Sequence, residues 1–242
     1  ITSVVNVVDK FIDEGVIVST KSRVLFENHE FLATPDKTTF TKKVPIVILI
    51  NRGSASASEI LSGALKDYHL AYLVGEKTYG KGSVQQVIPL SNTDGFKMTT
   101  ARYYTPSDVN IDKIGIPPDL EIKNFFIPEE QEDVYVKLVE SGELEKLAKE
   151  NSNMTEAEIA KAAEELAKTY PIDLRILRRL IRVQAKKAQS AALYDMDYDI
   201  QLQEALKIVQ HPDFFDLVKN TKTLKELQEE AEQKAAETQE EE

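Results

Sequence analysis

A short run of small residues holds a serine that is well placed for nucleophilic chemistry. Residues 51–59 read NRGSASASE and follow the apolar, β-branched run 44–50, which is typical of a buried strand. Apolar residues at helical spacing come next, so the sequence predicts a tight turn from a strand into a helix. Such a turn can lift a serine hydroxyl beside the free backbone N–H groups of a helix start, which favour negative charge. The alternative interpretation is a serine-rich helix cap.

A second stretch supplies a candidate base. Residues 79–85 read YGKGSVQ and follow another apolar run, 71–75. Lys81 stands between two glycines, where the backbone can turn sharply and pass close to another segment. Burial in apolar surroundings favours the neutral form of a lysine, and a neutral amine can take the proton of a serine. The alternative interpretation is a lysine in a solvated loop.

Together the two stretches resemble the C-terminal processing peptidases, also called tail-specific proteases. The pattern N-x-G-S-A-S-A-S-E is followed by G-x-x-x-x-G-K-G-S-x-Q, and the resemblance covers residues 1–125. It implies a serine endopeptidase that cleaves proteins near their C-termini through an acyl-enzyme. It also implies the roles of three side chains: Ser56 is the nucleophile, Lys81 is the general base, and Gln85 positions the lysine.

The resemblance implies two supporting roles and one missing part. The backbone N–H of Ala57 corresponds to an oxyanion-hole donor, and Asp67 corresponds to a residue that supports the site. The family's glycine-rich turn of the type L-R-x-N-P-G-G, its N-terminal region and its peptide-binding PDZ domain have no counterpart in the sequence, so we expect a fragment. Because that turn supplies the second oxyanion donor, its loss is expected to cost about 10²–10³ in rate.

Composition excludes several other classes of protein. The chain has 242 residues, a formal net charge of −11 and no basic stripe, which argues against nucleic-acid binding. It has no cysteine and only three scattered histidines, so neither a metal site nor another cofactor is expected. No histidine lies near the serine in either motif, which favours a lysine base over a Ser-His-Asp triad. No apolar run is long enough to cross a membrane.

The elements that must position these residues alternate between strand and helix, which indicates an α/β core. The sequence predicts helices over 3–14 and 56–68 and strands over 16–20, 24–26 with 31–33, 44–50 (the central strand), 71–75, 84–90 and 96–104. The resemblance implies that residues 1–127 form a ClpP/crotonase-like core, in which ββα units stack in a spiral.

Residues 128–242 carry almost no strand signal and predict an all-helical region that packs on the core or joins subunits. A capping box at Thr155–Glu158 marks one helix start, and the basic cluster between residues 175 and 187 is interpreted as a solvated helix face balanced by nearby acids. Since apolar stripes of these helices need cover, we expect a homo-oligomer.

The expected substrates are unstructured protein C-termini, presented as an added strand at a sheet edge. The resemblance alone implies a location in the periplasm or at the outer face of the cytoplasmic membrane. Two other functions stay open: a catalytically silent peptide-binding scaffold of the same fold, and an acyl-CoA enzyme of the crotonase type.

Overall fold

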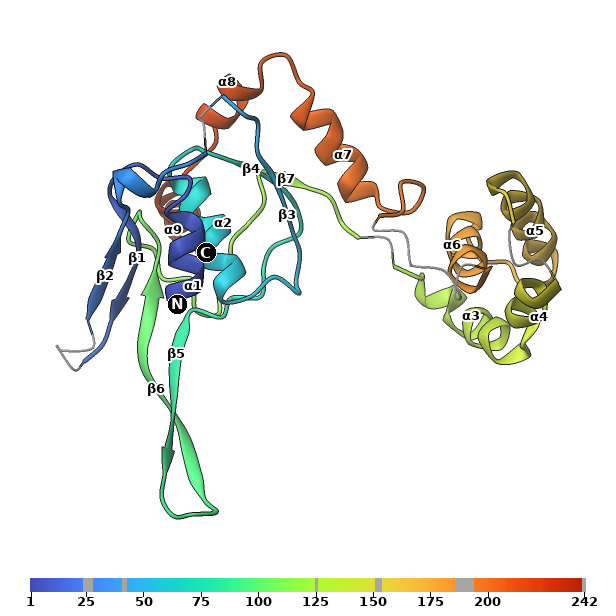
Figure 1. Cartoon of the computed structure of the whole chain (residues 1–242), viewed down its shortest axis with the longest axis horizontal. Coiled ribbons are helices and arrows are strands. Elements are labelled where there is room, and N and C mark those ends of the chain that lie inside the picture. The colour runs from blue at the N-terminus through green and yellow to red at the C-terminus, as the bar shows by residue number, and fades with distance from the viewer. Residues whose placement is uncertain (24–27, 41–42, 125, 151–153, 186–193, 241–242) are drawn as a thin grey trace. The chain divides into compact units, whose positions relative to one another are not determined.

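The computed structural model describes residues 1–23, 28–40, 43–124, 126–150, 154–185 and 194–240. The chain divides into two compact units (Figure 1). The first unit contains residues 1–123 and 204–242, and the second contains residues 124–203. The region 128–242, predicted from composition to be one helical part, is therefore shared between the two units.

The first unit contains two sheets. One has the strand order β2-β1-β6-β5 and is antiparallel throughout. The other has the order β3-β4-β7 and is parallel. The strands are β1 (Val16–Lys21), β2 (His29–Leu32), β3 (Val47–Ile50), β4 (Tyr72–Gly75), β5 (Ser83–Pro89), β6 (Gly95–Tyr104) and β7 (Leu120–Glu121). The mixed α/β character predicted for this part of the chain is confirmed.

Strand β3 corrects one prediction. The run 44–50 predicted a buried central strand, but β3 begins only at Val47 and lies at the edge of its sheet among the described strands. It pairs with β4 alone, from Val47 opposite Tyr72 to Ile50 opposite Gly75. Because no described strand covers its other side, Leu49 is 40% exposed. The strand predicted at 24–26 lies outside the described residues.

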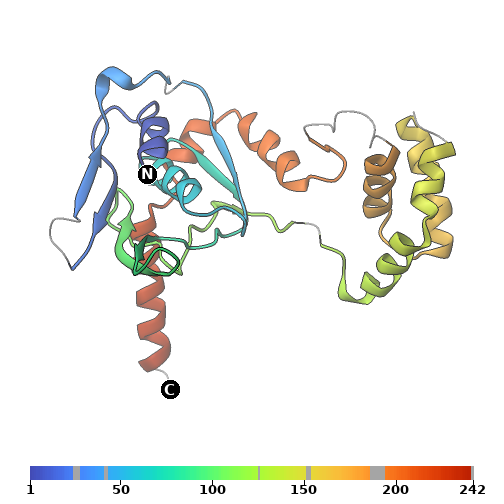
Figure 2. The ribbon, with the colours of Figure 1, turned by 60° about the horizontal axis from the view of Figure 1, so that its bottom comes forward.

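The helices of the first unit are α1 (Thr2–Val8), α2 (Ala57–Asp67), α8 (Phe214–Lys219) and α9 (Leu224–Glu240). Helix α1 ends well before the predicted limit at residue 14. The chain tightens there through a hydrogen bond from Phe11 N to Val8 O, and the Lys10 carbonyl accepts from Thr39 N and Phe40 N instead of continuing the helix. Figure 2 shows the far half of α9 projecting from the unit.

Helix α2 is the central element of this unit, because it packs against both sheets and both chain ends. It contacts β1, β4, α1 and α9, and Leu224 at the start of α9 is 4% exposed. A buried ion pair fixes α2 to the parallel sheet: Lys66 Nζ bonds to Asp119 Oδ1, while Asp119 Oδ2 accepts from Leu73 N at 2.8 Å. The core cluster comprises Val8, Ile12, Ile17, Val18, Ile50, Ile60, Ala64, Leu65, Ala71, Leu73, Val109, Ile111, Ile116 and Leu224.

The second unit is helical in its described part. It contains α3 (Glu129–Ser141), α4 (Glu143–Glu150), α5 (Glu156–Thr169) and α6 (Leu174–Ala185), while α7 (Ile200–Val209) includes the boundary between the units. The capping box predicted at the start of α5 is present, since Thr155 Oγ1 accepts from Glu158 N. Its own core comprises Leu138, Leu144, Ile159, Ala163, Leu166, Ile172, Ile176, Leu177 and Ile181.

Two arginines of α6 pair with acids as predicted, but the side chain of Arg182 is only 12% exposed and so does not lie on the solvated face that we expected. Arg178 binds both carboxylate oxygens of Asp197, at 2.7 and 2.8 Å, and Arg182 binds Asp195 at 2.7 Å. The hydrogen bonds from Arg178 hold the pKa of the Asp197 carboxyl below its usual value. Among the described residues, no helix combines the length and the apolar character that a membrane span requires.

Candidate active site

Ser56 stands at a strained strand-to-helix turn. It is the N-cap of α2, with φ 55° and ψ −111°, a conformation that residues with a side chain rarely adopt. The turn before it is fixed by Asn51, whose carbonyl accepts from Ser54 N at 2.9 Å and whose side chain accepts from Gly53 N at 2.8 Å. Strain of this kind costs about 1–3 kcal/mol and gathers at functional sites. The strained serine between a strand and a helix is also the geometry of known nucleophile turns.

The lysine turn passes tightly against a second loop, as its two glycines predicted. Gly80 has φ +86°, and a Cβ placed on Gly82 would lie 2.4 Å from Asp112 N. The Gly80 carbonyl accepts from Lys113 N at 2.7 Å. A side chain at either glycine would therefore push loop 111–115 away from the backbone of Lys81.

A buried glutamate joins the two turns. Glu59, in the first turn of α2, is 0% exposed. Its Oε2 accepts from Ser56 N at 2.9 Å and from Lys81 N at 2.8 Å, and its Oε1 accepts from Gly80 N at 2.7 Å. Because Oε2 accepts from both nitrogens, the distance between Ser56 N and Lys81 N cannot exceed the sum of these two hydrogen-bond lengths. The charge is stabilised by these donors and by the N-terminus of α2.

Thr78 extends this network to the parallel sheet. Its hydroxyl donates to Glu59 Oε1 at 2.5 Å and accepts from Ile116 N at 2.7 Å. In addition, Tyr79 N donates to Ser54 O at 3.0 Å. The serine turn, the lysine turn and the segment before β7 are therefore held as one assembly.

The side chains of the predicted dyad are not joined in this structure. No hydrogen bond links the Ser56 hydroxyl to the Lys81 amine within the described residues, and Lys81 is exposed. The apolar, packed surroundings that we expected for this lysine are therefore absent from the described part of the chain, and its environment matches the solvated alternative. The backbone N–H of Lys81 is held by Glu59, whereas its side chain is exposed and makes no hydrogen bond or ion pair within the described residues.

Lys81 and Gln85 line one cavity of about 490 Å³. Its lining residues are Ala55, Tyr79, Gly80, Lys81, Ser83, Gln85, Asp112 and Lys113. Gln85 is exposed, and its Nε2 lies 3.5 Å from Thr99 Oγ1 on the neighbouring strand instead of bonding to Lys81. Ser56 is not among the lining residues, although its neighbour Ala55 is. The backbone N–H of Ala57 has no acceptor within the described residues, as an oxyanion donor requires.

Asp67 lies at the other end of α2 from the serine. Eleven residues of helix separate it from Ser56, which is about 16 Å. Its Oδ2 accepts from Ser107 N at 3.0 Å, and its Oδ1 accepts from Leu224 N at 2.8 Å. In this structure, Asp67 therefore fastens the start of α9 and a surface loop to α2.

Glu59 and Thr78 are the residues of this site that the sequence interpretation missed. A signal for Glu59 was present, because S-x-x-E at a helix start is a capping-box pattern, and Glu59 does return a hydrogen bond to Ser56 N. Thr78 carries no such local signal, since its partners are distant in the chain. Among the described residues, no group of three or more acidic or histidine side chains is arranged to hold a metal ion.

Comparison with known proteins gives one family. The sequence model described as "Peptidase family S41" matches residues 1–122. The chain is 44% identical over 137 residues to the carboxy-terminal-processing protease of Bartonella bacilliformis, a match that covers 57% of this chain and 31% of that protein. It is 39% identical over 130 residues to the chloroplastic C-terminal processing peptidase of Tetradesmus obliquus, covering 54% and 27%.

Among solved structures, the photosystem II D1 C-terminal processing protease is similar, with a TM-score of 0.45 and 39% identity over 50% of this chain and 31% of that one. The chain thus spans about a third or less of the length of these relatives.

Proposed function

Because the chain belongs to peptidase family S41, we propose that it carries the serine and lysine of an endopeptidase that cleaves proteins near their C-termini. The observation that carries the proposal is the strained conformation of Ser56, whose turn is tied through Glu59 to the turn of Lys81. A residue that only caps a helix needs no such strain. In a nucleophile, the strained backbone places the hydroxyl above the start of α2.

The proposed reaction passes through an acyl-enzyme. Lys81 Nζ, as the neutral amine, takes the proton of Ser56 Oγ while this oxygen attacks the substrate carbonyl carbon. The Ala57 N–H stabilises the oxyanion, and Lys81 then gives the proton to the leaving amine. A water molecule, activated by the same amine, hydrolyses the ester and frees Ser56. Gln85 holds the Lys81 amine toward the serine once substrate is bound.

Substrate itself supplies the burial that the exposed lysine needs. Strand β5 begins two residues after Lys81 and lies at the edge of its sheet among the described strands. An unstructured C-terminus that adds to this edge would cover the cavity beside Lys81 and exclude water from it. The core that presents this edge is proposed to be the ClpP/crotonase-like spiral. The proposed location is the periplasm or the outer face of the cytoplasmic membrane.

The test compares four forms of this chain in cleavage of an unfolded protein such as reduced casein. Ser56→Ala and Lys81→Ala should each abolish cleavage while the circular dichroism spectrum stays unchanged. Lys77→Ala, which removes an exposed lysine four residues before Lys81, is the matched control and should cleave normally. A serine-reactive phosphonate should label Ser56 in the Lys77→Ala form and not in the Lys81→Ala form.

Two results would overturn the proposal. One is normal cleavage by the Ser56→Ala form. The other is a folded parent chain that neither cleaves nor reacts with the phosphonate, which would favour the catalytically silent scaffold.

Oligomerisation through the helical region belongs to the same proposal. Apolar side chains of α3 and α6, including Val136, Val139 and Val183, are each close to half exposed or more. A second copy would cover them. Size-exclusion chromatography with light scattering should give a dimer or larger species at micromolar concentration, and a monomer would contradict this part.

A further inference from the structure

A second cavity lies away from the proposed active site, at the C-terminal end of α2. It measures about 310 Å³ and belongs wholly to the first unit. Its lining residues are Phe11, Phe40, Val44, Ile46, Tyr68, His69, Leu70, Phe214, Phe215, Val218 and Lys219. About 16 Å of helix separates its edge from Ser56, so its chemistry is independent of the catalytic proposal.

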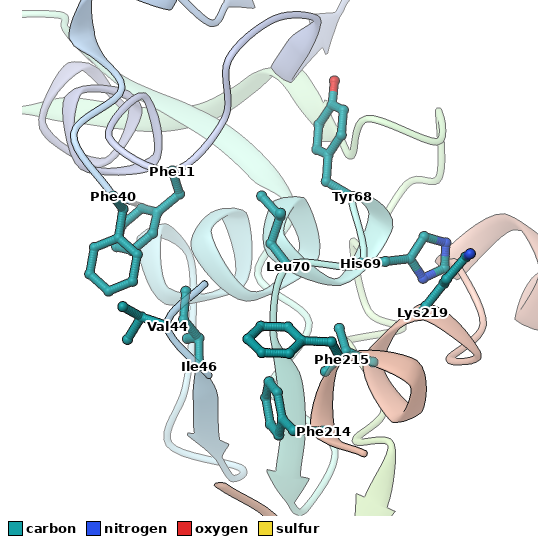
Figure 3. A pocket seen from close by; sticks show the side chains of 11 residues that line it. Phe11, Phe40, Val44, Ile46, Tyr68, His69, Leu70, Phe214, Phe215 and Lys219 are labelled. Carbon is teal, nitrogen blue, oxygen red and sulfur yellow. The ribbon is translucent and has the colours of Figure 1, made fainter. Parts of the chain in front are cut away.

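Aromatic and aliphatic side chains form most of the wall, and several remain open to water. Figure 3 shows Phe11 and Phe40 packed together on one side, with ring centroids 4.8 Å apart, and Phe214 and Phe215 on the other. Phe215 is 50% exposed and Val44 is 47% exposed. The volume lies at the lower end of the range for small-molecule sites. An apolar ligand would therefore cover apolar surface that is otherwise exposed to water.

One of the described lining residues, Lys219, has a cationic side chain. In the view of Figure 3, its side chain lies on the same side of the cavity as the side chain of His69. Lys219 is exposed and makes no ion pair within the described part of the chain. The Thr221 hydroxyl donates to Val218 O at 2.7 Å, so it accepts from His69 Nδ1–H at 3.2 Å. His69 is thereby oriented, with its Nδ1 directed at Thr221.

Apart from His69 and Lys219, the described lining residues include one polar side chain, that of Tyr68. The Tyr68 hydroxyl already donates to Val16 O at 3.0 Å. Glu226, which interacts electrostatically with His69, is held by Thr223 N and Oγ1 at 2.8 and 2.9 Å. A peptide would bury amide groups without partners there, which is unfavourable, whereas a hydrocarbon chain has none.

We propose that this cavity binds a fatty monocarboxylate, with its alkyl chain among the phenylalanines and its carboxylate at Lys219. The volume holds roughly ten molecules of liquid water, and a methylene group is of similar size, so a ten-carbon acid is the matching probe. The net charge of the chain is −11, so an anion needs a local cation such as Lys219.

The test is calorimetric titration of the whole chain with decanoate below its micellar concentration. We expect one saturable site, and octanoate, which has two fewer methylenes, should bind about tenfold more weakly. Lys219→Met should weaken decanoate about two- to fivefold without affecting decanol, because an exposed ion pair contributes little.

Location is tested separately. The chain has no tryptophan, so Phe215→Trp places a single reporter in the wall, and its emission should shift to the blue as decanoate binds. Val44→Trp should fill the cavity and abolish binding. Lys97→Met, which removes an exposed lysine of β6, is the matched charge control and should bind as the parent does.

Four outcomes would overturn the proposal: no saturable binding, equal affinity for decanol and decanoate, unchanged affinity in Lys219→Met, or tighter binding of a peptide with an apolar C-terminus. None of these outcomes bears on cleavage by Ser56, and loss of cleavage has no consequence for this site.

Discussion

Replacing Glu59 by glutamine tests whether one buried carboxylate holds the serine and lysine turns together. Each carboxylate oxygen accepts two hydrogen bonds: Oε2 from the backbones of Ser56 and Lys81, and Oε1 from Thr78 and Gly80. A glutamine side chain keeps one of these oxygens as an acceptor. Its NH₂ group replaces the other oxygen and faces the two donors that were bonded to it. A hydrogen bond to a charged group contributes about 1.5–3 kcal/mol, so losing two predicts a loss of roughly 3–6 kcal/mol. The free energy of unfolding of a whole domain is typically about 5–15 kcal/mol, so this loss is large.

Two measurements check this prediction. Urea unfolding of the Glu59→Gln form, followed by circular dichroism, gives the free energy of unfolding of the first unit. Amide hydrogen exchange then reports on the turns directly, and the Gly80 and Lys81 amides should exchange about a hundredfold faster or more. The matched control is Glu121→Gln, because Glu121 is an exposed glutamate at the end of β7.

A loss below about 1 kcal/mol, with Gly80 and Lys81 still protected, would refute the reasoning. It would mean that packing of the surrounding loops, and not the carboxylate, holds the two turns. The control should lose nothing measurable, so any loss common to both variants would be assigned to the general removal of negative charge.

Three further predictions concern single positions. Ser56→Gly should raise the free energy of unfolding by about 1 kcal/mol, because glycine relieves the strained φ of 55°; a lower melting temperature would contradict this. Gly82→Ala should lower the free energy of unfolding by about 1–3 kcal/mol, because the new Cβ would lie 2.4 Å from Asp112 N. An unchanged urea midpoint would exclude that contact. Asp197→Asn should cost roughly 1 kcal/mol at pH 7 by removing the pair with Arg178. Because the folded pKa of Asp197 is lowered, this contribution is present above about pH 4, near the pKa of a free aspartate, and is lost as the pH falls through the folded pKa. The melting temperatures of the two forms should therefore converge as the pH is lowered.

Local patterns predicted the elements that depend on neighbours in sequence. The strands predicted over 84–90 and 96–104 are present as β5 and β6, and the start of α5 follows from the capping box at Thr155. The close pass at the lysine turn was also predicted, because only glycine permits such an approach on both sides of Lys81.

Patterns failed where pairing or burial depends on distant segments. The apolar run before the serine turn predicted a central strand, yet its position at the sheet edge is set by the β3–β4 and β4–β7 pairings. Strand β7, two residues long after a pair of prolines, and the six-residue helix α8 are too short for a periodicity to appear.

The sequence by itself determined the identity and spacing of the chemical groups: a serine at a strand-to-helix turn, a lysine between glycines, and the family that combines them. The tertiary structure alone decided that Glu59 joins these turns, that Lys81 faces water, and that α9 returns to the first unit. The physical reason is that a short motif fixes local backbone geometry, whereas burial and hydrogen-bond partners depend on segments brought together from elsewhere in the chain.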